Sequence, residues 1–483
     1  MRRRIPSVPA VTRPLRLTCC LLVAVATLAA CRPQSPSSSA AQSQTRVSLI
    51  VTGGTVVTMD AQRRILAPGA VAIDGPRIVA VGTPEEIVRR YVAADTIPAD
   101  GQVVMPGLVN THTHAPMVLF RGLADDLALM DWLNHYIFPA EAKAVTPEFV
   151  RIGTRLAALE MIESGTTTFT DMYYFEEEVA RAAREAGLRG VLGETIIGFP
   201  SPDAKTPAEG LARAERFILE FKDDPLITAT VAPHAMYTLD PASLEACRDL
   251  ANKYETPLIT HLAETGDEVR IARERFGRSP ASYLESIGLL SPSTIAAHAV
   301  HLTAEDIGIL VGHGVGVSHN PESNMKLASG TAPVSNMLAA GVPVGLGTDG
   351  AASNNDLDMF DAMRVTVLLH KLVERNPKAM PAAAVLEMAT LGGARAIGQS
   401  DRIGSLEPGR LADLIVVSMD SPRQTPLYNV VSHLVYVTRG DDVRTTIVNG
   451  RVLMRDRAVL SMARDEVLAD ARRIAADVRA AVK

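Results

Sequence analysis

Between about residue 106 and residue 400 the chain alternates short apolar runs with stretches of helical periodicity, and this alternation constrains the fold most strongly. Segments such as FVRIGTRLAALEMIESG and FEEEVARAAREAG separate eight apolar runs, which read VVMPGLVNTHTH, TTTFTDM, RGVLGETII, LITATVAPH, PLITHLAE, TIAAHAVH, GVGVSHNP and VPVGLGTDG. Strands alternating with helices form parallel sheets. Eight such units predict the α/β class, with a TIM-like (β/α)8 barrel over residues 106–400.

The segments flanking this region predict a second, smaller structure. Residues 47–105 contain alternating β-branched and small residues with Gly and Pro punctuation, as in SLIVTGGTVVTMD and GAVAIDGPRIVAVG. Residues 401–483 add GSLEPGRLADLIVVSM and VRTTIVNGRVLM, and residues 464–478 have a helical period. We therefore expect one composite β-sandwich, built from both ends of the chain, with a C-terminal helix.

The first 46 residues have the pattern of an export signal followed by a tether. Residues 1–16 are rich in arginine, and residues 17–30 form a 14-residue apolar run, which is the length of a signal-peptide core. The run ends in LAAC, which resembles the bacterial lipoprotein cleavage box with Cys31 as the acylated residue. A Pro/Ser/Gln-rich tether follows over residues 32–46. We expect a signal peptide over residues 1–30 and a lipidated tether over residues 31–46. An ordinary cleaved signal with a chance cysteine is the alternative.

Arg32, the residue after Cys31, indicates where the protein is located, and the net charge indicates which partners it can bind. Arg32 stands where an Asp favours inner-membrane retention, so a periplasmic protein anchored by lipid to the outer membrane is the favoured location. The net charge of −6 becomes −11 once the five arginines of residues 1–30 are set aside. An acidic body with 4% aromatic residues excludes nucleic acid as the expected partner. Cys247 is the one cysteine in the body, so no disulfide framework exists.

Polar residues gather where the eight apolar runs end. Six of the eight runs end with a histidine or an Asp-Gly turn. The active site of such a barrel lies at the C-terminal ends of its strands, so these side chains should share one cavity. The residues at the run ends are His112, His114, Asp171, Glu194, His234, His261, His298, His319 and Asp349.

Four of these residues predict a metal site. His112 and His114 are two positions apart, so a strand directs both imidazoles to the same side. With His261 and Asp349 they form a donor set that suits Zn²⁺ with one open position. The third and fourth runs contain no lysine that could bridge two metals after carbamylation. We therefore expect one divalent metal per chain, and a hydrogen-bonding role for Glu194.

A hydrolytic site also needs groups that move protons. Glu264, three residues after His261, is the expected proton donor, although a helix N-terminal carboxylate is the structural alternative. His298 is expected to orient the water or to stabilise the oxyanion, whereas His301 is expected to be a loop or packing histidine. His234 and His319 remain open between a substrate contact and a supporting role, with His234 slightly favoured.

Several motifs, in order, resemble the amidohydrolase superfamily. They are PGLVNTHTHAPMVLFRGLADDLALMDWL, HLAET, AAHAVHL, SHNPESNMKLASGTAPV and GTDGAASNNDLDMF, and the resemblance runs from about residue 47 to the end. Within the superfamily they are similar to the branch that holds 5′-methylthioadenosine/S-adenosylhomocysteine deaminases and chlorotriazine hydrolases. A homodimer is the candidate oligomer, because homodimers are common in similar proteins.

The resemblance implies roles for individual residues. It implies zinc binding by His112, His114, His261 and Asp349, ring protonation by Glu264, and control of the attacking water by His298 and Asp349. It also implies that Trp132, Glu141 and His234 contact the substrate, with Glu141 on the sugar. The loop GFPSPDAKTPAEGLARAERF has no clear match to the arginines that hold an amino-acid tail, and Arg213 and Arg216 are expected on a helix surface.

The expected activity is zinc-dependent hydrolytic deamination of a 6-aminopurine nucleoside of the 5′-methylthioadenosine, adenosine or S-adenosylhomocysteine type, by hydroxide generated at the metal. One alternative keeps the site and changes the heterocycle: triazine dechlorination or deamination, or deamination of a pterin or guanine-type base. A second alternative is a zinc- or solute-binding lipoprotein without catalysis, although the chain has no histidine-rich run.

Overall fold

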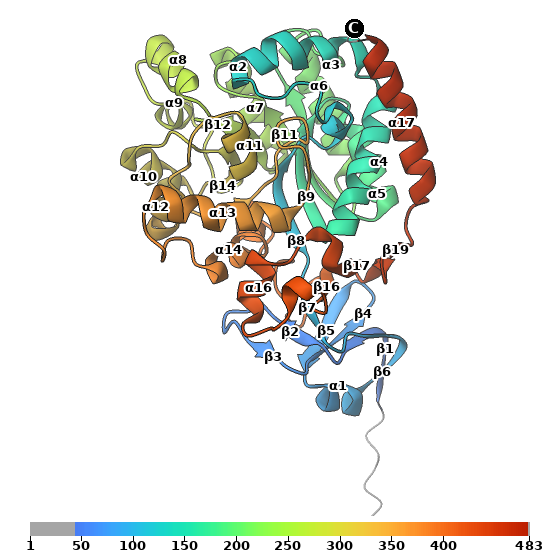
Figure 1. Ribbon diagram of the computed structural model, residues 1–483. Helices are drawn as coiled ribbons and strands as arrows, with labels where there is room; N and C mark the ends of the chain where they lie inside the picture. Colours follow the sequence, from blue (N-terminus) through green and yellow to red (C-terminus); the bar gives the residue numbers. More distant parts are fainter. Residues whose placement is uncertain (1–43, 482–483) are drawn as a thin grey trace, which may run out of the picture. The chain divides into compact units, whose positions relative to one another are not determined.

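The computed structural model describes residues 44–481 (Figure 1). The predicted signal peptide, Cys31 and nearly all of the predicted tether lie outside the described residues. Within the described part of the chain, no helix is both long enough and apolar enough to cross a bilayer.

Eight strands close into a barrel in which neighbours along the chain are neighbours in space, and the last strand returns to the first. Every pair is parallel. The strands are β8 (Leu108–Thr113), β9 (Thr166–Tyr173), β10 (Arg189–Ile196), β11 (Ile227–Pro233), β12 (Leu258–Leu262), β13 (Thr294–His298), β14 (Gly316–His319) and β15 (Val344–Leu346). Each of the eight apolar runs supplies one of these strands, so the predicted (β/α)8 barrel is confirmed.

Helices surround the barrel and begin where the sequence places capping residues. Thr146, Thr206 and Asp240 each accept a hydrogen bond from the backbone N–H three residues on, and a proline follows each of them. The surrounding helices are α4 (Pro147–Ser164), α5 (Glu176–Ala186), α6 (Pro207–Phe221), α7 (Pro241–Tyr254), α8 (Gly266–Phe276), α9 (Pro280–Ser286), α10 (Ala304–His313), α11 (Pro321–Lys326), α12 (Val334–Ala340) and α13 (Met359–Val373).

The two ends of the chain form the predicted composite sandwich. One sheet has the order β5 (Arg77–Gly82), β4 (Ala70–Asp74), β1 (Thr45–Thr52), β6 (Tyr91–Pro98). The other has the order β19 (Ala458–Val459), β18 (Arg451–Arg455), β17 (Val443–Val448), β16 (Leu414–Ser418), β7 (Gln102–Pro106), β2 (Thr55–Val57), β3 (Ile65–Leu66). Because β16 pairs with β7, the second sheet joins the two ends of the chain. Val51 and Ile73 of one sheet pack with Val104 and Val416 of the other, and α1 (Pro84–Arg90) covers the first sheet's opposite face.

The first apolar run crosses the predicted boundary between the sandwich (residues 47–105) and the barrel (residues 106–400), and it forms one strand on each side. Residues 102–106 are β7 in the sandwich, and residues 108–113 are β8 in the barrel. Gly107 joins them, and a Cβ at this position would lie 2.1 Å from Oγ1 of Thr167. Glycine is therefore required where the chain passes from the sandwich into the barrel.

The barrel is open at one end only. Val191, Ile259 and Ile295 on the strands pack with Ala394 and Ile397 at its N-terminal end. The short helices α14 (Ala382–Met388) and α15 (Leu391–Ala396) pack against barrel strands, α15 at this end. Farther along the chain are η3 (Pro422–Gln424), α16 (Val430–Tyr436), which packs against α13 and α14, and η4 (Gly440–Asp442), which packs against α4 and α13. The polar strand ends therefore face the opposite, open end.

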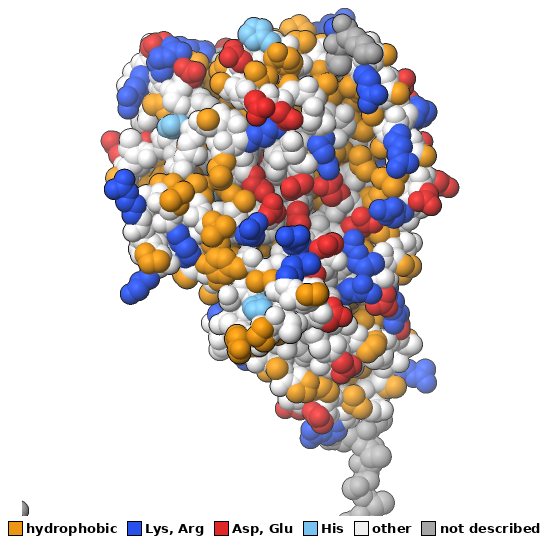
Figure 2. Space-filling model, in the orientation of Figure 1, with side chains coloured by type: hydrophobic (Ala, Val, Ile, Leu, Met, Phe, Trp, Pro, Cys, Tyr) orange, Lys and Arg blue, Asp and Glu red, His pale blue; other side chains and the backbone are white. Residues whose placement is uncertain are grey.

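A helical segment after β8 borders the open end. It consists of η1 (Ala115–Phe120), α2 (Leu129–Trp132), the π-helical turn η2 (Leu133–Ile137) and α3 (Phe138–Ala144). The C-terminal helix α17 (Arg464–Ala481) runs along α4 and reaches α3 (Figure 1). On the face shown in Figure 2, acidic side chains gather in the middle with basic ones around them, so opposite charges lie close together on this face.

Candidate active site

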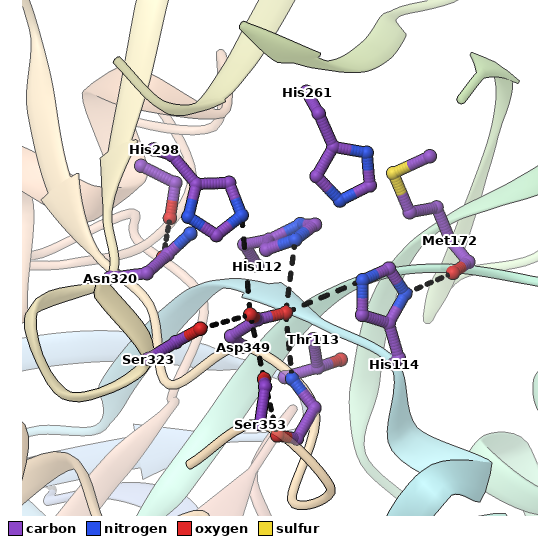
Figure 3. Close-up of polar contacts among 12 residues, drawn as sticks. His112, Thr113, His114, Met172, His261, His298, Asn320, Ser323, Asp349 and Ser353 are labelled. Carbon is purple, nitrogen blue, oxygen red and sulfur yellow. Dashed lines mark hydrogen bonds and ion pairs between the residues drawn. The ribbon is translucent and has the colours of Figure 1, made fainter. Parts of the chain in front are cut away.

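Four histidines and one aspartate converge at the C-terminal ends of the barrel strands. His112 lies on β8, His261 on β12 and His298 at the end of β13, whereas His114 and Asp349 lie just beyond β8 and β15. In Figure 3 the four imidazoles surround the Asp349 carboxylate. Its Oδ1 is 3.4 Å from His112 Nε2 and 3.3 Å from His114 Nε2. The ligand atoms of His112, His114 and His261 lie within 4.8 Å of one another, so all four predicted ligands meet.

The hydrogen bonds behind these rings leave metal-binding nitrogens free. Nδ1 of His114 donates to the carbonyl of Met172 at 2.6 Å, and Nδ1 of His261 donates to the carbonyl of His234 at 2.8 Å. Each bond fixes the tautomer whose Nε2 carries a lone pair. His112 is fully buried, and neither of its ring nitrogens has a hydrogen-bond partner. An orphaned buried imidazole beside two oriented ones and a carboxylate fits a zinc ion.

Asp349 is held by residues that the sequence reasoning did not single out. Its Oδ2 accepts hydrogen bonds from the hydroxyls of Ser323 at 2.7 Å and Ser353 at 2.8 Å (Figure 3). Burial raises the pKa of Asp349, but the close approach of His112, 3.4 Å away, and the charges of the neighbouring histidines outweigh it and hold the pKa well below its usual range. The side chain is therefore an ionised acceptor at neutral pH.

Burial and nearby charged groups together set the protonation of the other site residues. It lowers the pKa of His112 to about 4, which keeps this imidazole neutral, as a metal ligand must be. Burial also raises the pKa of Glu264. Burial lowers the pKa of His298, but the carboxylates of Glu264 and Asp349 and the contact with Asn324 outweigh it and raise the pKa overall. A carboxyl that can keep its proton thus lies 3.9 Å from an imidazole that favours its charged form.

The loops that carry these residues have an uncommon backbone. Ala263, His298, Ala299 and Asp349 all have positive φ, between 50° and 73°. Such left-handed conformations cost a residue with a side chain about 1 kcal/mol or more, and they persist only where surrounding contacts enforce them. Their clustering at the ends of β12, β13 and β15 marks this end of the barrel as a functional site.

A cavity opens beside the cluster of candidate metal ligands. The predicted substrate contacts Trp132, Glu141 and His234 all line it, together with Glu264 and His298. The rest of the lining is mainly apolar or aromatic: Met117, Leu129, Leu133, Ile137, Phe138, Met172, Tyr173, Tyr174, Tyr237 and Leu327. This mainly apolar and aromatic lining suits a small, mostly planar organic molecule.

Two of the lining residues have polar groups ready for a ligand. The indole N–H of Trp132 is buried and has no hydrogen-bond partner among the described residues. Glu141 is buried and accepts a hydrogen bond from Tyr173 at 2.8 Å, and burial raises the pKa of Glu141 to about 8. A donor and a carboxyl are therefore available in an otherwise apolar wall.

Several candidates from the strand ends lie away from the cavity. His319 is fully buried and pairs with His370, with 3.3 Å between their Nε2 atoms. His301 is an exposed loop residue whose Nε2 bonds the carbonyl of Ser329. Asp171 accepts hydrogen bonds from the Thr113 hydroxyl and the Ala115 N–H, which brace the chain around His114.

The expectation that Arg213 lies on a helix surface is wrong. Its guanidinium bonds Glu194 and Glu177, both at 2.8 Å, and lies 3.2 Å from Asp203. The other oxygen of Glu194 accepts the backbone N–H of Glu176. Both oxygens of Glu194 are thus engaged as hydrogen-bond acceptors. Helical periodicity could not reveal this, because the carboxylates come from a strand (Glu194), another helix (Glu177) and a loop (Asp203).

Comparison with known proteins identifies the family. The family model described as the amidohydrolase family matches residues 103–453, which is more than half of the chain. The chain belongs to the amidohydrolase family. A second, short match over residues 69–91 is to the bacterial imidazolonepropionase-like composite domain, which falls in the sandwich. Together the two matches cover the barrel and parts of the sandwich.

Similar amidohydrolases include deaminases and a chlorohydrolase. A 5-methylthioadenosine/S-adenosylhomocysteine deaminase from Syntrophobacter fumaroxidans is 52% identical over 434 residues, which are 90% of this chain and 99% of the relative. The crystal structure of an adenosine deaminase from Xanthomonas campestris with bound zinc has 39% identity and a TM-score of 0.89, and the match covers 91% of this chain and all of that one. A zinc-bound atrazine chlorohydrolase from Arthrobacter aurescens has 25% identity and a TM-score of 0.82, with 88% and 100% covered.

Proposed function

We propose that this amidohydrolase is a zinc-dependent aminohydrolase that deaminates a 6-aminopurine nucleoside. The observation that carries the proposal is one cavity in which Glu264 and His298 lie beside the metal cluster while Glu141 lies in the same wall. A base can thus face the metal while its sugar faces a carboxyl. The activities named for the relatives from Syntrophobacter fumaroxidans and Xanthomonas campestris support this choice.

One divalent metal per chain, most simply Zn²⁺, would be held by His112, His114, His261 and Asp349. When bound there, zinc supplies a Lewis acid that lowers the pKa of water toward 7. The third and fourth strands contain no lysine that could bridge a second ion, and both oxygens of Glu194 are already bonded. Elemental analysis giving two tightly bound ions per chain would contradict this stoichiometry.

The residues of the wall would bind the nucleoside. The unpartnered indole N–H of Trp132 is a donor for a purine nitrogen, and the Glu141 carboxyl would hydrogen-bond to the ribose hydroxyls. His234 lies beside His261, with 4.8 Å between the ring centroids, and completes the wall near the metal. These contacts would hold the amino-bearing carbon of the ring near Glu264 and His298.

The proton steps follow from the electrostatics of three residues. Water attacks C6, and Asp349 and His298 take part in removing its proton and in holding the oxygen on the tetrahedral carbon. Glu264 donates a proton to N1, which makes C6 electron-poor enough for attack. The C6 amino group then leaves as ammonia after accepting a proton, so water and an adenine nucleoside give the hypoxanthine nucleoside and ammonia.

We further propose that an uncharged 5′-group is preferred, as in 5′-methylthioadenosine or adenosine. None of the described residues that line the cavity is a lysine or an arginine. Arg213, on the loop-and-helix segment after β10, is already bonded to Glu194 and Glu177. The zwitterionic tail of S-adenosylhomocysteine would therefore lack a cationic partner in this wall.

The deciding experiment follows the ultraviolet change from adenine to hypoxanthine for 5′-methylthioadenosine, adenosine and S-adenosylhomocysteine. We expect conversion of the first two, slower conversion of the third, and far slower conversion of free adenine, which cannot contact Glu141. No conversion of any nucleoside, with chloride or ammonia released from a triazine, pterin or guanine-type compound, would favour the other heterocycles. Bound zinc with no turnover at all would indicate a binding protein.

We also propose that the protein is exported and anchored to the outer membrane from the periplasm through a lipid on Cys31. The support is the arginine-rich start, the apolar run and the LAAC box. The membrane contact would be the lipid alone, since no described helix could span a bilayer. A homodimer is the oligomer we propose to test by light scattering.

A further inference from the structure

A buried carboxylate lies directly behind the proton-donating residue and takes no part in the steps above. Glu268 is in the first turn of α8 and is 1% exposed. Its Oε1 accepts a hydrogen bond from the backbone N–H of Ala263 at 2.9 Å, and its Oε2 accepts one from the N–H of Glu264 at 3.0 Å. One carboxylate thus holds two successive peptide groups at the end of β12.

The held segment is a strained turn. Ala263 has a φ of 50°, which a residue with a side chain adopts only when its surroundings enforce it. The turn redirects the chain between the ligand His261 and Glu264, both of which line the cavity. The side chain of Glu264 therefore reaches the cavity from a backbone that Glu268 keeps in a left-handed conformation.

The opposite side of the same turn is braced by the neighbouring loop. The carbonyl of Ala263 accepts the N–H groups of Val300 at 3.1 Å and His301 at 2.9 Å. These residues directly follow His298 and Ala299, which also have positive φ. The Ala263 carbonyl faces this neighbouring loop and the Ala263 N–H faces Glu268, so two elements fix the turn.

An ordinary helix cap does not account for Glu268. In α10, which follows the adjacent strand, Asp306 occupies the equivalent third position, and its carboxylate bonds the N–H of its own capping residue Thr303 at 2.9 Å. In α8 the capping residue is Thr265, and Glu268 reaches past it to the two residues before. The carboxylate of Glu268 is thus directed at the turn that carries Glu264.

We propose that Glu268 is a positioning residue that acts through Glu264, by holding the Ala263 turn that aims the Glu264 carboxyl at the substrate. The inference rests on the proposed deamination, in which Glu264 donates the proton. A reacting group displaced by about 1 Å can lose about 10²-fold in rate. Loss of this clamp should therefore reduce kcat while the metal site and the sugar contacts remain.

The test is Glu268→Gln in the full-length protein, assayed with 5′-methylthioadenosine or whichever substrate the wild type converts best. An amide keeps one acceptor oxygen but places an NH₂ group against the second N–H. We expect kcat to fall about 10²-fold, with KM within threefold and zinc content unchanged. The matched control Asp306→Asn should lose helix capping but keep kcat within twofold.

A double variant shows whether Glu268 acts only by positioning Glu264 or also stabilises the site independently of Glu264. If Glu268 acts only through Glu264, then Glu264→Gln/Glu268→Gln should be no more than threefold slower than Glu264→Gln alone. A further loss of tenfold or more, zinc loss in Glu268→Gln, or an unchanged kcat would each overturn the inference. If Glu268→Gln folds poorly, Glu268→Asp, which keeps the charge but withdraws it from the turn, should lower kcat with zinc intact; a wild-type kcat would overturn the inference.

The wild-type assay tests the proposed deamination separately from the positioning role of Glu268. A wild type that converts no heterocycle contradicts the proposed function, and the positioning role falls with it. A wild type that is active, with an equally active Glu268→Gln, contradicts the positioning role alone.

Discussion

Two carboxyls in the cavity wall, Glu264 and Glu141, are removed from water, and burial raises the pKa of each. Glu264 lies near His298, which favours its charged form, whereas Glu141 accepts a hydrogen bond from the Tyr173 hydroxyl. These environments suit proton transfer in the first case and hydrogen bonding to a sugar in the second. Replacement by glutamine should therefore reduce kcat at Glu264, but weaken nucleoside binding at Glu141.

For Glu264→Gln we expect an intact fold and full zinc content with kcat reduced by at least about 10²-fold, because an amide cannot donate the ring proton. Elemental analysis and a nucleoside assay check this prediction. His298→Asn should have a comparable effect, whereas His301→Asn should be mild, since His301 is an exposed loop residue. A larger loss of kcat in His301→Asn than in His298→Asn would show that His301, and not His298, takes part in the reaction.

Glu141→Gln should stabilise the protein at alkaline pH while weakening nucleoside binding. The folded pKa is about 8, above the ordinary value of 4.5, so between these values the folded state keeps a proton that the unfolded state loses. Stability therefore falls as pH rises through this window, by up to about 1.4 kcal/mol per unit. The variant lacks this loss, so its gain in Tm should be larger at pH 8 than at pH 6, and its KM for adenosine should rise. An equal change in Tm at both values would contradict the prediction.

The meeting of the candidate metal ligands could be predicted from the sequence, but the residues that support them could not. His112 and His114 share a side because strand geometry has a period of two, and Asp349 ends its own run. Glu268 and Ser353 act through contacts that depend on loop conformation, and the positive φ of Ala263 has no signature in an alanine. Local periodicity does not record such contacts between loops.

At the scale of elements, strand order followed from alternation, and the boundary predicted between residues 105 and 106 lies beside Gly107, where the first run divides. The segment VVMPGLVNTHTH contains apolar residues on both sides of Gly107, so its pattern is that of one strand. Partners distant in sequence divide it: β7 pairs with β16, and β8 pairs with β9. The Gly107 N–H donates to the carbonyl of Asp413 at the junction.

Gly107→Ala should therefore destabilise the protein by more than about 2 kcal/mol, because the new Cβ would overlap the Thr167 side chain and neither strand can move freely. Thermal unfolding would measure the loss. The matched control is Gly101→Ala, because Gly101 has open space around its Cβ position, although its φ of 70° makes a smaller cost expected. Equal losses in the two variants would show that crowding at Thr167 is unimportant.

At the scale of the molecule, the sandwich and the barrel are joined by buried charges as well as by the shared chain. Arg189 at the start of β10 pairs with Asp413 just before β16, through bonds of 2.8 and 3.2 Å, and both side chains are 2% exposed. Removing one partner of such a pair leaves an uncompensated buried charge, which costs about 3–5 kcal/mol. The two parts should therefore unfold together rather than separately.

The whole protein should be held at a membrane only by its first residues, and Cys31→Ala tests this. Because the proposed lipid is attached to the Cys31 thiol, the variant should take up no labelled fatty acid and should leave the membrane fraction. Its zinc content and kcat should stay unchanged, because the barrel begins far along the chain at β8. Cys20→Ala is the matched control: it removes a thiol of the same segment that lacks this context and should keep the lipid. A mature wild-type chain that carries no lipid, or that begins at another residue, would show that LAAC is a chance match.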